Sequence, residues 1–116
     1  MSTDSIVKAK SMDFAKRIVK LYKYLCKEHH EFVMSKQILR SGTSIGANIA
    51  EAIYGSSRKD FVAKLQIAQK EAAETLYWLE LLNSSDYVPD KLYVSLCEDC
   101  REILAILAAT IKTCLE

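Results

Sequence analysis

Glycine and proline are scarce in this sequence, with three glycines and one proline among 116 residues. A turn-rich β fold needs many more of them, and a chain that is 50% hydrophobic is not disordered. No apolar run approaches the roughly 20 residues of a transmembrane helix. The first ten residues carry charges where a signal peptide has an apolar stretch. We therefore expect an all-α, cytoplasmic protein with no membrane partner.

An excess of charge of one sign is also missing. Sixteen Lys and Arg residues face fifteen Asp and Glu residues, a net charge of +1. The chain as a whole therefore has no field that attracts nucleic acid, and an electrostatic partner must contact a local patch. The four cysteines are expected to be free thiols, because the cytoplasm is reducing and buried cysteine packs as a small apolar residue.

Apolar periodicity predicts four helices in one domain, residues 1–116, with helices at about 5–28, 35–54, 58–83 and 89–115. Ser35 is the expected N-cap of the second helix. The third helix has the clearest repeat, a heptad seam. Its positions are Phe61, Leu65, Ala68, Ala72, Thr75, Leu79 and Leu82. Short connections make consecutive helices antiparallel, so we predict an up-down-up-down four-helix bundle.

The last two predicted helices have a second apolar face beside the first. It comprises Val62, Leu76, Tyr77, Cys97, Leu104, Ala108 and Ile111. One stripe of roughly 100° per helix is enough for a monomeric bundle. The wider stripe therefore predicts that another copy of the chain covers part of the surface, as in a homo-oligomer.

Residues 39–52, LRSGTSIGANIAEA, resemble the signature of a bacterial family of four-helix bundles first noticed as reading frames in intervening sequences of 23S ribosomal RNA genes. The third helix also resembles that family, at Lys64, Leu65, Ala68, 70–72, 74–75 and 77–82. The resemblance implies a ring-like homopentamer and no enzymatic activity. Relatives include the strongly basic accessory variability proteins of diversity-generating retroelements, to which binding of nucleic acid and of a reverse transcriptase is attributed.

Gly42, Gly46 and Ala50 recur every four residues on the second predicted helix. A glycine inside a helix costs about 1 kcal/mol relative to alanine. Two on one face therefore indicate close packing of another helix, and a groove that admits a ligand is the alternative.

Polar residues form a neighbouring stripe on the second helix, and partners for them lie on the third. The set is Arg40, Ser44, Asn48, Glu51, Lys64, Glu71 and Glu74. We expect Arg40 to pair with Glu71, because a partly buried guanidinium needs a carboxylate. The predicted role is a buried network that fixes helix register or a subunit contact. A site for a small ligand or phosphate is the alternative.

Lysines follow one line along the first helix, at Lys16, Lys20, Lys23 and Lys27, with Arg17 beside them. Such a stripe can neutralise up to about four phosphates, in a weak and sequence-blind nucleic-acid contact. The alternative is an ordinary solvated face.

Cysteine and histidine support one further hypothesis. Cys26 and His29 lie one turn apart, as do Cys97 and Cys100, and the bundle topology puts both pairs at one pole, where they could hold zinc. The cysteines at 97, 100 and 114 also fit the apolar pattern alone, so no metal or cofactor is expected. The only two histidines are adjacent, whereas di-iron bundles need Glu-x-x-His pairs on two helices. We therefore predict no enzyme.

Four aromatic residues gather at the same predicted pole: Tyr77, Trp78, Tyr87 and Tyr93. They either anchor a partner protein or close the end of the core. The sequence as a whole favours a non-enzymatic homo-oligomeric scaffold that binds a protein partner. The alternative is an accessory factor that binds RNA or DNA through the first helix.

Overall fold

Four α-helices make up the computed structural model, which describes residues 3–116. They are α1 (Thr3–His29), α2 (Met34–Ile53), α3 (Arg58–Ser84) and α4 (Asp90–Leu115), and no strand occurs in this range. The predicted boundaries differ from these by at most two residues. Within residues 3–116, no helix has a stretch long and apolar enough to cross a lipid bilayer.

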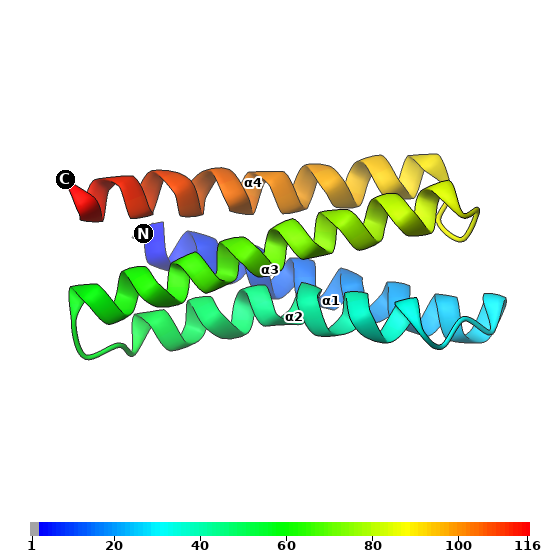
Figure 1. Cartoon of the computed structure of the whole chain (residues 1–116), viewed down its shortest axis with the longest axis horizontal. Helices are drawn as coiled ribbons and strands as arrows, with labels where there is room; N and C mark the ends of the chain where they lie inside the picture. Colours follow the sequence, from blue (N-terminus) through cyan, green and yellow to red (C-terminus); the bar gives the residue numbers. More distant parts are fainter. Residues whose placement is uncertain (1–2) are drawn as a thin grey trace.

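The helices run alternately up and down along an elongated molecule of 45 × 22 × 21 Å (Figure 1). Each helix packs beside the next one in sequence, and α4 returns beside α1. The diagonal pairs, α1 with α3 and α2 with α4, have no Cα atoms within 8 Å of each other. We call the end that holds the connections α1–α2 and α3–α4 pole A, and the end that holds the connection α2–α3 pole B.

The core lies along the bundle axis and uses the predicted heptad of α3. Its positions from Leu65 to Leu82 are buried, and the first, Phe61, is half-buried. From α1, the large side chains Phe14, Ile18 and Leu25 belong to the same core and are almost completely buried.

The second apolar face is only partly used inside the chain. Val62, Cys97 and Ile111 are buried by the chain's own helices, and Leu76 and Leu104 are half-buried. Tyr77, at 57%, and Ala108 are exposed. A helix in this bundle contacts two neighbours and needs a wider apolar stripe than one contact requires. The three buried residues therefore need no second copy to cover them, and the predicted association can rest only on the exposed remainder of the face.

Glu31, and not Ser35, caps the N-terminus of α2. Ser35 lies inside the helix and is buried, and the N-cap position is Val33, whose side chain makes no cap. The chain reverses at His30, where φ is 50°, and this turn places the Glu31 carboxylate over the start of the helix. The carboxylate accepts the backbone N–H groups of Val33, Met34 and Ser35 at 2.8 to 3.1 Å. The prediction failed because a carboxylate four residues earlier in the chain satisfies these donors.

Candidate interaction surfaces

The polar stripe of α2 meets α3 in a set of surface ion pairs. Arg40 Nη1 lies 3.2 Å from Glu71 Oε2, as predicted, and Arg40 Nη2 also contacts Glu74. Nearer pole B, Lys64 Nζ lies 3.0 Å from Glu51 Oε1. Along α2, Ser44 and Asn48 donate to backbone carbonyls one turn earlier. The two helices are therefore joined by charges at two levels.

This network is not buried in the single chain, which corrects the prediction. The Arg40 side chain is 51% exposed, because its long stem carries the guanidinium out past the packed residues. Glu74 accepts hydrogen bonds from the indole N–H of Trp78, at 2.9 Å, and from Arg40. These two bonds lower the pKa of Glu74, although partial burial opposes the change. Glu74 is therefore held ionised beside an exposed cation.

The small residues of α2 are packed against α1. A Cβ atom on Gly42 would lie 2.8 Å from Ile18 Cγ1, and one on Gly46 would lie 3.3 Å from Ser11 Oγ. Ala50 continues the stripe and is half-buried. Side chains of α1 therefore occupy the space at both glycines, which is the close packing that their spacing indicates.

The lysines of α1 face solvent on the side away from the core. Lys16, Lys20, Lys23 and Lys27 are each two residues after a buried position, which is about 200° around the helix. Among the described residues, none of the four is in an ion pair. Seven basic and three acidic residues give α1 a net charge of +4, four times that of the whole chain.

Arg17 is separate from this stripe. Its Nη1 lies 2.6 Å from Asp99 Oδ2, and its Nη2 donates to Ser95 Oγ at 3.0 Å, both on α4. The sequence could not show this, because position 17 lies between the core face and the lysine line. Arg17 therefore ties α1 to α4 and leaves four lysines in the stripe.

The residues of the zinc hypothesis do not come together. His29 Nε2 lies 3.1 Å from the Tyr24 hydroxyl, and Cys26 Sγ lies 3.7 Å from the Glu31 carbonyl. Cys97 and Cys100 are buried in α4, and burial raises the pKa of Cys100 to about 12. Across residues 3–116, no three His, Cys, Asp or Glu side chains are placed to hold a metal ion.

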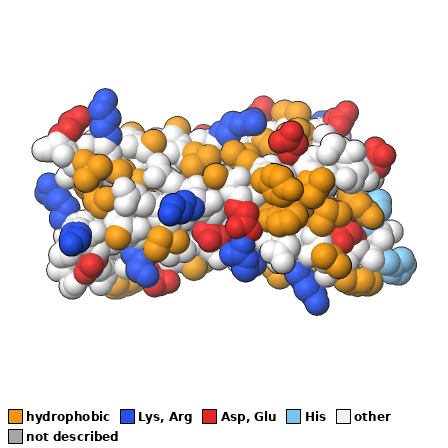
Figure 2. Space-filling model, in the orientation of Figure 1, with side chains coloured by type: hydrophobic (Ala, Val, Ile, Leu, Met, Phe, Trp, Pro, Cys, Tyr) orange, Lys and Arg blue, Asp and Glu red, His pale blue; other side chains and the backbone are white. Residues whose placement is uncertain are grey.

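The four aromatic residues near pole A divide into two kinds. Tyr87 and Tyr93 are half-buried against the core, and the ring of Tyr87 contacts His29 edge-on. Tyr77 is exposed, and its ring packs at 5.0 Å against that of Trp78. On the side of the molecule that Figure 2 shows, hydrophobic side chains gather in the half nearer pole A.

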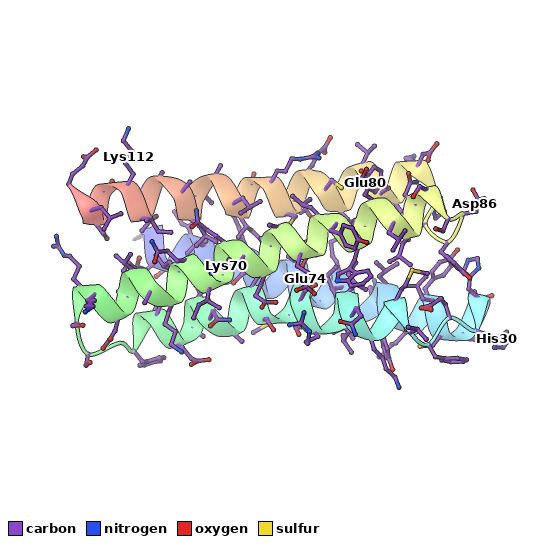
Figure 3. All side chains as sticks on the ribbon, in the orientation of Figure 1. His30, Lys70, Glu74, Glu80, Asp86 and Lys112 are labelled. Carbon is purple, nitrogen blue, oxygen red and sulfur yellow. The ribbon has the colours of Figure 1, made fainter. Side chains whose placement is uncertain are left out.

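The solvent-facing side of α3 carries a second heptad repeat that was not predicted from the sequence. It consists of Ala63, Ile67, Lys70, Glu74, Tyr77 and Leu81, each two residues after a position of the buried seam. We call these six residues the outer seam; Figure 3 labels Lys70 and Glu74. Ile67 is 41% exposed and Tyr77 is 57% exposed. The outer seam has two charged residues, Lys70 and Glu74, and Glu74 is paired with Arg40. Its alternating steps of four and three residues are present in the sequence, but the buried repeat is more strongly apolar and dominates the pattern.

The sequence model of the 23S rRNA-intervening sequence protein family matches residues 3–109. Among solved structures, the chain is similar to a protein with unknown function from the S23 ribosomal protein family, from Bacteroides thetaiotaomicron VPI-5482. The two are 58% identical, with a TM-score of 0.94, and the similarity covers 96% of this chain and 99% of that one. No curated protein matches the chain significantly.

Proposed function

The chain belongs to the 23S rRNA-intervening sequence protein family, and on that basis we propose that it acts without catalysis, as a homo-oligomeric scaffold for a protein partner. The stoichiometry that we propose is a pentamer, which the family resemblance implies. The outer seam of α3 is the surface through which the copies associate.

The outer seam supports this proposal because it differs from an ordinary solvated helix face. Solvated faces of bundle helices are rich in charged residues, whereas Ala63, Ile67, Tyr77 and Leu81 are apolar and follow heptad spacing. Heptad seams pack against other helices. Since α2 and α4 already cover the flanks of α3, the outer seam is free for a helix of another copy.

The ion pairs of Arg40 lie along one edge of the outer seam and share Glu74 with it. A partner helix on the seam would cover the half-exposed guanidinium, and the two carboxylates would compensate its charge. Networks of this kind fix register and oligomer state in some helical assemblies. They supply a specificity that an apolar seam alone lacks.

The experiment replaces Ile67 and Tyr77 by glutamate, singly and together. Each variant buries a charge in the proposed contact, so we expect the double variant to be monomeric by light scattering, with unchanged helical circular dichroism. The matched control is Met12→Glu on α1, since Met12 is 56% exposed and lies on the opposite side of the bundle. Dissociation of the control, or an intact double variant, would contradict the proposal.

Nucleic-acid binding is the second candidate, and the four lysines of α1 favour it. Because α1 and α3 are diagonal, association through α3 leaves the lysine stripes on the outside of the assembly. Several weak patches on one particle gain avidity for a long polyanion. We expect labelled single-stranded RNA to bind in low salt, and replacement of all four lysines by glutamine to abolish binding. No anisotropy change even in low salt would eliminate this candidate.

A further inference from the structure

The contact between α1 and α4 is the loosest of the four between neighbouring helices. Two ion pairs bridge it, Lys10 with Glu102 and Arg17 with Asp99, each at 2.6 Å. Between Arg17 and pole A the two helices enclose a groove of about 360 Å³. The groove lies away from the outer seam of α3, because α1 is diagonal to α3.

The groove has an apolar floor. Leu21 and Leu96 lie at its base and are almost completely buried, and the half-buried side chains of Tyr24 and Leu92 form its walls. The Tyr24 hydroxyl is fixed by His29 at 3.1 Å. The shape therefore exists before a ligand binds, which reduces the entropy lost on binding.

The rim of the groove is cationic. Arg17 and Lys20 line it, and Lys20 is one of the four exposed lysines in the stripe of α1. Lys91 is exposed in the first turn of α4 and directly precedes Leu92 in the chain. Asp99, which contacts the rim residue Arg17, is already paired with it. Toward pole A, Asp90 accepts a hydrogen bond from Asn83, and Glu28 is exposed on α1.

We propose that this groove binds an acidic amphipathic segment of a partner protein. One apolar side chain of the segment enters between Tyr24 and Leu92, and flanking carboxylates face Lys20 and its neighbours. This ligand uses both the floor and the rim, whereas the phosphates of an RNA need only the lysines. The inference deepens the scaffold proposal by naming its partner class.

The test is fluorescence anisotropy with a labelled helical peptide of about 15 residues that carries leucines on one face and glutamates elsewhere. A second peptide has lysine in place of every glutamate. We expect the acidic peptide to bind and the basic one not to bind. Leu92→Ala and Lys20→Glu should each weaken binding about tenfold. The matched control, Lys112→Glu, makes the same charge change at the far end of α4 and should have no effect.

Leu92 also touches the core, so circular dichroism must show that Leu92→Ala is folded, and Lys20→Glu provides an independent surface variant. Equal binding of both peptides would overturn the proposal. So would an acidic-peptide affinity that Leu92→Ala leaves unchanged, since charge alone would then explain the binding. Labelled RNA should be insensitive to Leu92→Ala; loss of RNA binding in this variant would instead assign the groove to nucleic acid.

Light scattering on the same samples separates this inference from the scaffold proposal. A monomer that binds the acidic peptide would contradict the scaffold and keep the groove. An oligomer that ignores the peptide would contradict the groove alone.

Discussion

The capping carboxylate of Glu31 gives a sharp test of how α2 is held in place. Glu31→Ala removes the acceptor of the N–H groups of Val33, Met34 and Ser35. Water cannot replace it fully, because Ser35 is completely buried. An orphaned buried donor costs about 1–3 kcal/mol, so we expect Glu31→Ala to lower the free energy of unfolding by about 2 kcal/mol. Glu31→Gln keeps a neutral acceptor and should cost about 1 kcal/mol.

The effect of Glu31 should depend on pH. Burial raises the pKa of Glu31, but hydrogen bonds from the N–H groups of Ser35, Val33 and Met34 outweigh it and lower the pKa. A carboxylate with a lowered pKa in the folded state stabilises the protein above its unfolded pKa of about 4.3. The stability difference between wild type and Glu31→Gln should therefore be constant near neutral pH and disappear as the pH falls through the folded pKa.

Urea unfolding followed by circular dichroism measures this difference, with the protein concentration held fixed because association shifts apparent stability. Glu28→Gln is the matched control, since Glu28 is an exposed carboxylate three residues earlier. A cost for Glu31→Gln no larger than that for Glu28→Gln would refute the capping role. A difference that persists unchanged in acid would refute the charge as its origin.

Two further predictions concern buried groups. Gly42→Ala should lower the free energy of unfolding by about 1 kcal/mol or more, because a Cβ 2.8 Å from Ile18 outweighs the gain in helix propensity. Gly46→Ala should be nearly neutral, because its Cβ would lie 3.3 Å from the Ser11 hydroxyl, a milder contact that the gain in helix propensity offsets. Equal urea midpoints for the two variants would contradict this. Iodoacetamide at mildly alkaline pH should label the half-exposed Cys114 well before Cys100, whose thiol is buried and has a pKa raised to about 12, and mass spectrometry of timed digests would expose the opposite order.

The fold was accessible from the sequence because its strongest signals are local. The heptad of α3 and the turn residues at 55–57 and 83–86 mark helices without reference to tertiary contacts. The pair Arg40–Glu71 was also within reach, because an antiparallel hairpin sets which levels of two helices meet. The pair Arg17–Asp99 was not, since it joins the first helix to the last across 82 positions.

Burial was harder to predict than contact. The spacing of Val62, Cys97 and Ile111 suggested a face that another copy covers, but packing against two neighbours already buries these residues. Four residues of the outer seam, Ala63, Ile67, Lys70 and Tyr77, do remain exposed. Periodicity alone cannot distinguish the two faces, because which side of a helix is covered depends on where its neighbours lie.

Association of the chain is the claim on which the scaffold proposal depends, and native mass spectrometry of the wild-type protein tests it most directly. We expect a closed particle of five chains, each of 13.1 kDa, that dissociates when Ile67 and Tyr77 are both replaced by glutamate. A wild-type protein that remains a monomer at micromolar concentration would contradict it.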